Sequence, residues 1–183
     1  MSEELIVRHC SPTLAGLKTA NMFSCEYASP EKLRQDVISF NRRFACKGIQ
    51  AVALKKADNK ALMYVYRPSK LKKDLESASA CKILSEYGYD RTSPGRCIVR
   101  LSERLKTCGS FPHEIGLFLG YPPEDVIGFI ENDAKNYKYI GCWKVYSNEA
   151  NARKTFARYK KCTDVYMKQF ANGNTIERLT VAI

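Results

Sequence analysis

The chain has 183 residues, of which 45% are hydrophobic and 27% charged, the balance of an ordinary folded protein and not of a disordered or fibrous one. Its 30 lysines and arginines outnumber its 19 acidic residues, and the net charge of +11 suits an anionic partner without choosing between nucleic acid, lipid and a small molecule. This length predicts one compact domain over residues 1–183.

The sequence contains no recognisable signal peptide or membrane span. The N-terminus carries acidic residues, and no apolar run approaches the ~18 residues that a span needs. We therefore expect a cytoplasmic protein without a membrane partner. The 8 cysteines should be reduced there, and their scattered positions lack the C-x-x-C spacing of a zinc ribbon or an iron–sulfur site.

The predicted elements begin with two helices. Ser11 is followed by proline, which is favourable helix-start chemistry and predicts a helix over residues 13–24. Ser29, also followed by proline, predicts the N-cap of a second helix. The apolar residues of this helix recur at helical spacing until Gly48 ends it.

A β-hairpin is predicted next, because apolar runs at 49–54 and 61–67 flank the polar link KKADNK. Three helical stretches follow it: PSKLKKDLES, SACKILSEYGY and SPGRCIVRLSERLKTCG. The rest of the chain alternates the predicted strands EIGLFLG, YIGCWKVYS and ERLTVAI with helices over 123–132 and 148–170. These elements predict an α+β fold, with helices packed on a mixed or antiparallel sheet of about five strands.

One cysteine and one histidine suggest catalysis. Cys10 lies just before the predicted helix at residue 13, where the helix dipole and unpaired N–H groups favour the thiolate. His113 opens a predicted strand, and this order of cysteine and histidine is that of papain-like hydrolases. Glu114 is added as a group that orients His113 indirectly. The first hypothesis is thus a thiol-dependent hydrolase or acyl-transfer enzyme; the alternative is a core thiol and a turn histidine.

Binding of a cofactor is the second hypothesis. The donors that a transition metal or a haem iron would accept are His9, Cys10 and His113. Aromatic rings could stack on a flat anionic ligand such as a porphyrin or flavin, and cations could pair with its carboxylate or phosphate. The residues assigned to these roles are Tyr64, Tyr66, Arg67, Trp143 and Lys144, together with His9. Nucleic-acid binding through the basic surface is a third hypothesis.

Four stretches carry a resemblance to a known family: RHCSPTLAGLKTANMF, MYVYRPSKL, FPHEIGLFLGYPPEDVIGFI and GCWKVY. They resemble a bacterial family of anaerobic Firmicutes, the domain of unknown function 3793, over nearly the full length. The resemblance implies a single-domain cytosolic protein and no particular reaction. Because relatives lie near genes for ferrous-iron transport and flavodoxin, it also implies a haem, metal or flavin cofactor in iron or redox metabolism, and a flavodoxin-like redox partner.

Overall fold

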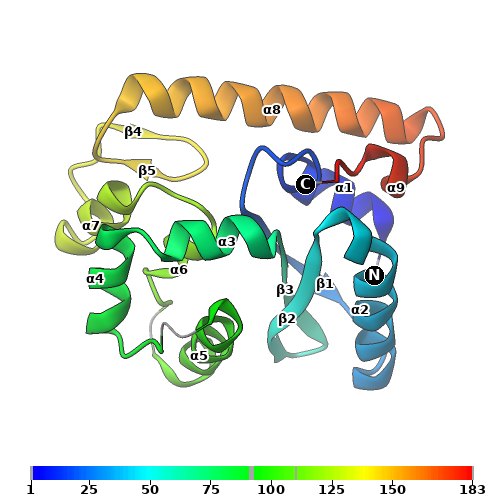
Figure 1. Cartoon of the computed structure of the whole chain (residues 1–183), viewed down its shortest axis with the longest axis horizontal. Helices are drawn as coiled ribbons and strands as arrows, with labels where there is room; N and C mark the ends of the chain where they lie inside the picture. Colours follow the sequence, from blue (N-terminus) through cyan, green and yellow to red (C-terminus); the bar gives the residue numbers. More distant parts are fainter. Residues whose placement is uncertain (1, 91–92, 110, 183) are drawn as a thin grey trace. The chain divides into compact units, whose positions relative to one another are not determined.

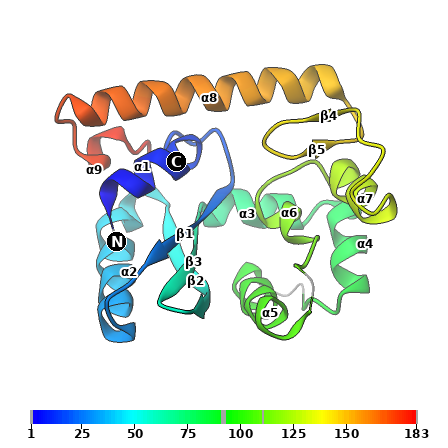
Figure 2. The same cartoon turned by 180° about the vertical axis from the view of Figure 1, so that it is seen from behind.

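A computed structural model describes residues 2–90, 93–109 and 111–182 (Figures 1 and 2). The chain folds into two compact units. Unit 1 contains the residues up to Leu71 and those from Lys161 onward, and unit 2 is Lys72–Lys160. The predicted α+β class is confirmed. The described strands are antiparallel and belong to two sheets, one of three strands in unit 1 and one of two strands in unit 2. The single domain over residues 1–183 stays a prediction.

The sheet of unit 1 is built around the predicted hairpin. Its strands are β1 (Ala20–Glu26), β2 (Gln50–Ala57) and β3 (Lys60–Tyr66), with β3 in the centre. Asp58 and Asn59 join β2 to β3 with φ of 49° and 60°, the two left-handed positions that a type I′ turn requires. The hairpin is therefore confirmed, and its link is shorter than the predicted KKADNK.

The start of the chain differs from the prediction. Helix α1 covers Glu3–Leu14, and the stretch predicted as a helix over 13–24 contains the end of α1, a turn and the first part of β1. Ser2 caps α1 and two glutamates occupy its first turn, which is favourable helix-start chemistry earlier than Ser11. Pro12 is tolerated inside the helix, so the Ser-Pro pair marks its last turn and not its beginning.

The second predicted helix is confirmed as α2 (Pro30–Phe44), with Ser29 accepting the N-cap hydrogen bond from Lys32. A short 3₁₀ turn, η1 (Ala45–Lys47), leads to Gly48, whose φ of 66° ends the helix. Helices α1 and α2 pack on the same sheet face, and Figures 1 and 2 show α2 running alongside the strands.

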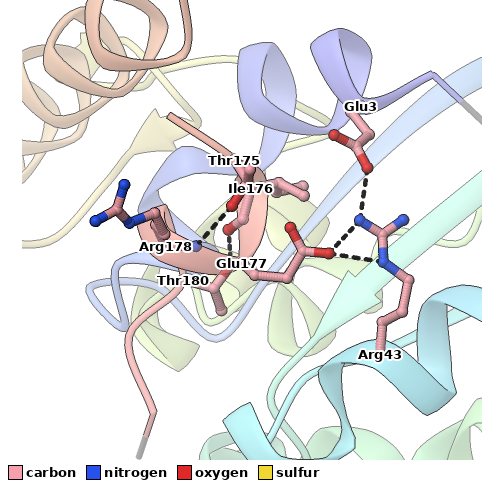
Figure 3. A network of polar contacts seen from close by, with 7 residues as sticks. All are labelled: Glu3, Arg43, Thr175, Ile176, Glu177, Arg178 and Thr180. Carbon is pink, nitrogen blue, oxygen red and sulfur yellow. Dashed lines mark hydrogen bonds and ion pairs between the residues drawn. The ribbon is translucent and has the colours of Figure 1, made fainter. Parts of the chain in front are cut away.

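A surface network connects three helices of unit 1 (Figure 3). Arg43 of α2 donates hydrogen bonds to Glu3 of α1 and Glu177 of α9 (Ile176–Leu179). Burial alone would raise the pKa of Glu177, but the hydrogen bonds from Arg43 bring it below its ordinary value. Because these side chains are about 40% exposed, the network contributes of order 1 kcal/mol or less.

The helices predicted between residues 68 and 108 are confirmed as α3 (Pro68–Leu75), α4 (Ala78–Glu86) and α5 (Pro94–Thr107). Unit 2 continues with α6 (Ile115–Phe118), α7 (Pro123–Glu131), β4 (Tyr139–Ile140) and β5 (Lys144–Val145). Helix α8 (Glu149–Ala171) runs from unit 2 into unit 1. Helices α7 and α8 match the predictions at 123–132 and 148–170.

None of the three later predicted strands forms as one continuous strand. The stretch EIGLFLG contains the single helical turn α6, and its buried apolar run is a pattern that strands and buried helices share. The stretch YIGCWKVYS folds back on itself as the β4–β5 hairpin. The stretch ERLTVAI contains α9, whose N-cap is Thr175; its last residue, Ile183, lies outside the described residues.

None of the helices within residues 2–90, 93–109 and 111–182 combines the length and the apolar character that crossing a lipid bilayer requires.

Candidate functional site

Cys10 does not have the environment that the thiol-enzyme hypothesis needs. It lies in the third turn of α1, not ahead of a helix, and its side chain is completely buried in the core of unit 1. Burial raises the pKa of this thiol far above its ordinary value, and the charge of Lys18 offsets only part of the effect. Cys10 is therefore a core thiol here. His113 belongs to unit 2.

The aromatic residues proposed from unit 1 pack within that unit. His9 is exposed and stacks on Phe23 of β1 with ring centroids 5.4 Å apart. Tyr64 and Tyr66 of β3 stack on each other at 4.9 Å, and the Tyr66 hydroxyl donates to Gln50. Tyr64 is completely buried, so its face is not available to a ligand ring without rearrangement.

Arg67 is also used internally. Its guanidinium is completely buried and donates to four main-chain carbonyl groups, those of Thr13, Leu14, Lys47 and Val181, at 2.7–3.0 Å. Two of these carbonyls are at the C-terminal end of α1, where a positive charge is favourable. Burial lowers the pKa of Arg67 below its ordinary value, yet a guanidinium remains charged near neutral pH. Arg67 thus stabilises the fold, and its guanidinium is not available to bind an external anion.

Unit 2 contains a pocket of about 380 Å³ between α6, α7 and the β4–β5 hairpin. Its walls are mostly apolar and aromatic. The lining residues are Phe111, His113, Ile115, Gly116, Leu119, Tyr121, Asp125, Val126, Phe129, Ile140, Gly141, Cys142, Trp143 and Lys144. Three of the predicted site residues, His113, Trp143 and Lys144, come together here.

Phe129 of α7 contacts both His113 and Lys144. The His113 ring packs against it with centroids 4.9 Å apart, tilted by 58°. The Lys144 ammonium lies 5.7 Å from the centre of the same ring and 4.8 Å from that of Tyr137. It also donates to the carbonyl of Ala134 at 2.8 Å. An ammonium has three donors, so two N–H groups of Lys144 lack an acceptor in the described part of the chain.

Trp143 is held from three sides. Its ring stacks on Tyr121 at 4.7 Å and meets the edge of Phe156 at 4.5 Å. Its indole N–H donates to the buried carboxylate of Asp125 at 2.7 Å. A tryptophan fixed by two rings and a hydrogen bond presents a preformed apolar surface, as small-molecule sites usually do.

The turn of the hairpin depends on Gly141. A Cβ atom at this position would lie 2.3 Å from ring atoms of Phe156, so only glycine lets the helix α8 ring pack against the turn. The same turn carries Cys142, which is exposed, and the carbonyl of Cys142 accepts a hydrogen bond from the Tyr121 hydroxyl. Burial raises the pKa of Tyr121 to about 12, so this hydroxyl stays protonated as a donor.

Glu114 is buried and forms hydrogen bonds that stabilise the fold of unit 2. It is 1% exposed and accepts hydrogen bonds from the Tyr89 hydroxyl and the Arg104 guanidinium. It does not line the pocket that contains His113. Burial and the adjacent Glu114 charge raise the pKa of Tyr89 strongly, which keeps the phenol protonated as the donor. The pairing ties α5 to the segment that precedes α6.

The sequence analysis missed other residues of the pocket. Asp125 was not proposed, although its carboxylate accepts from Trp143 and from two main-chain N–H groups. Phe129 and Tyr121 were not proposed either. Their aromatic character was the available signal, but their convergence depends on tertiary structure. Among the described residues, no group of three or more His, Cys, Asp or Glu side chains is arranged to hold a metal ion.

Comparison with known proteins gives one result. A family model described as "Protein of unknown function (DUF3793)" matches residues 6–180. No match was found among curated proteins or among solved structures.

Proposed function

The chain belongs to the DUF3793 family of proteins of unknown function, and we propose that it binds a planar aromatic anion of about the size of a flavin in the pocket of unit 2. One observation carries the proposal. A preformed aromatic pocket brings His113 together with the adjacent pair Trp143 and Lys144, although His113 comes from a different stretch of the sequence.

The shape and lining of the pocket favour a flat ligand. Ligand pockets usually measure roughly 300–1,000 Å³ and combine apolar walls with a few polar groups. At about 380 Å³ the pocket is near the lower limit, which suits one ring system better than the larger macrocycle of haem. Trp143 stacked on Tyr121 supplies an aromatic surface on which such a ring can lie.

The polar groups of the pocket favour an anion. Lys144 is the cation of the lining, and the Asp125 carboxylate, which also lines the pocket, already accepts from three N–H groups. Two N–H groups of Lys144 lack an acceptor among the described residues and can donate to a phosphate or carboxylate. The net charge of +11 attracts the same kind of ligand over a longer range. His113 adds a ring nitrogen that can donate to, or accept from, a heteroatom of the ligand.

The other hypotheses have less support. The thiol enzyme needs a reactive Cys10, and this thiol is buried within a helix. Nucleic-acid binding is supported only by the net charge, and one basic residue of α8, Arg153, already pairs with Glu149 of the same helix. A cytoplasmic location and a redox partner stay predictions.

The experiment uses the fact that Trp143 is the single tryptophan of the chain. Its fluorescence therefore reports only on the pocket. Flavin mononucleotide, neutral riboflavin and haemin are titrated into the protein under anaerobic conditions, with correction for absorption by the ligand. We expect saturable quenching by flavin mononucleotide, and weaker binding of riboflavin because it lacks the phosphate.

Matched variants test the role of the charge. Lys144→Met should weaken flavin mononucleotide binding roughly tenfold, the effect of losing one charge-assisted hydrogen bond, and should leave riboflavin nearly unchanged. Lys82→Met removes an exposed lysine of α4 that does not line the pocket and should change neither. Absence of saturable quenching by any of the three probes, or an equal effect of the two lysine variants, would contradict the proposal.

A further inference from the structure

Strand β2 of unit 1 is an edge strand, with β3 on one side. Its other side faces α2, and one side chain of this helix forms hydrogen bonds with the main chain of β2. The amide of Asn41 in α2 donates to the carbonyl of Ala51 at 3.0 Å and accepts from its N–H at 2.7 Å. At Ala51 the edge of the sheet is therefore closed by a side chain that imitates a neighbouring strand.

Farther along β2 the edge of the sheet is open. Main-chain groups of an antiparallel strand point in turn toward the partner strand and away from it. Since the N–H of Ala51 points away from β3, so does that of Ala53, two residues on. A register shift follows Ala53, and Lys56 opposite Ala61 is the next residue with outward groups. Within the described chain, these outward N–H and C=O groups of Ala53 and Lys56 have no hydrogen-bond partner.

A groove of about 220 Å³ runs past these open groups. Its helix wall is the α2 face that continues from Asn41, one and two turns earlier: Leu33, Arg34, Val37 and Ile38. Its strand wall consists of Ala53 and Lys56. Ile38 is 39% exposed, so the groove presents an apolar side chain to solvent.

The groove is also basic. Arg34 and Lys56 both line it, and neither forms an ion pair with another described residue. Lys55 adds a third exposed cation to the same strand. We propose that this groove binds an extended acidic peptide segment of a partner protein. The segment adds a strand to β2 at Ala53 and Lys56 and places apolar side chains between Val37 and Ile38.

The positive charge of β2 favours an acidic peptide over a second copy of the chain. Pairing β2 with itself would bring Lys55 and Lys56 of two copies together, and lysines on an edge strand oppose such association. A segment with alternating acidic and apolar residues matches both the positive charge and the apolar side chains of the groove. Its acidic side chains pair with Arg34 and Lys56, and its main chain continues the sheet.

The test is selection of peptides from a random ten-residue phage library on the full chain, with counter-selection on an Arg34→Glu/Lys56→Glu double variant. We expect enriched peptides in which acidic and apolar residues alternate. On addition of an enriched peptide, hydrogen exchange at the Ala53 and Lys56 amides should slow at least tenfold. The Ala51 amide, which Asn41 already protects, should change little.

Two controls make the result specific. Arg42→Glu changes an exposed arginine of the same helix outside the groove and should bind the selected peptides as the wild type does. The double variant should lose them and bind versions in which lysine replaces the acidic residues, which also shows that it is folded. The proposal is overturned if no peptide is enriched, if both variants lose binding equally, or if Ala53 is protected without peptide in a concentration-dependent way, which would identify a second copy as the occupant.

Discussion

The indole N–H of Trp143 donates to one carboxylate oxygen of Asp125 at 2.7 Å, and this bond fixes the hairpin turn to α7. The other oxygen accepts from the main-chain N–H groups of Tyr146 and Ser147, both at 2.8 Å. Burial alone would raise the pKa of Asp125, but these three donors bring it below its ordinary value. One buried carboxylate therefore positions the aromatic wall of the pocket.

Replacing Asp125 by asparagine should destabilise the protein. The amide can still accept from Tyr146 and Ser147, but its NH₂ group then faces the N–H of Trp143, so a buried donor loses its acceptor. The expected cost is roughly 2–3 kcal/mol of unfolding free energy, the range for hydrogen bonds to a charged group. Urea unfolding followed by Trp143 fluorescence measures it, and Glu124→Gln, one residue earlier on the exposed side of α7, should cost less than about 0.5 kcal/mol.

The same carboxylate predicts a pH dependence. Because its native pKa lies below the unfolded value of about 3.9, Asp125 adds stability above that value, and the stability is lost as the pH falls through the native pKa. The difference in unfolding free energy between the wild type and Asp125→Asn should therefore shrink as the pH is lowered from 5 toward and below about 3. A difference that stays constant over this range would show that the charge of Asp125 contributes nothing.

Gly128 should tolerate no side chain. A Cβ atom there would lie 2.5 Å and 2.6 Å from Cγ and Cβ of Tyr146, atoms too close to the main chain to move aside. Gly128→Ala should therefore cost about 1–3 kcal/mol through overpacking, although alanine is the better helix former. At Gly109 a Cβ atom meets nothing within 4 Å, so Gly109→Ala should be within about 0.5 kcal/mol of the wild type. Equal thermal midpoints for the two variants would contradict this account.

The elements that could be predicted from sequence are those with local signals. Helix α2 has a Ser-Pro start and a glycine stop, and α8 is long and amphipathic, so no distant contact was needed to place them. Strand β1 has no such signal. Its burial does not alternate strictly, and it forms by pairing with β3, some forty residues later, which a local pattern does not encode.

The candidate site could also be predicted only in part from the sequence. His113, Trp143 and Lys144 were proposed for their chemistry alone, and α6, α7 and the hairpin bring them to one pocket. The pairing of His113 with Cys10 depended on a helix start that the structure moves ten residues earlier, so the reason for a reactive thiol disappears. Arg67 was proposed as an anion ligand because a sequence does not reveal that four carbonyl groups surround it.

Arg67 should be essential for stability. Arg67→Met keeps most of the apolar volume but leaves several buried carbonyls without a donor, at a cost of about 3 kcal/mol or more. As a control, Arg8→Met removes an exposed arginine that pairs with Glu4 one turn away, and should cost about 0.5 kcal/mol or less. Urea unfolding of both variants decides the matter: similar midpoints would mean that the carbonyl groups find other donors.

Alkylation of the cysteines distinguishes the pocket from the buried thiol. Cys46 and Cys142 are exposed, whereas Cys10 is completely buried and burial raises its pKa, so it offers neither access nor thiolate. With iodoacetamide near neutral pH, mass spectrometry should find Cys46 and Cys142 modified first and Cys10 last. Flavin mononucleotide should slow the modification of Cys142, which lines the pocket, and leave Cys46 as an internal control. Rapid modification of Cys10 would instead restore the thiol-enzyme hypothesis. It would mean that the thiol is accessible, through a local opening of α1 or a different packing of the core.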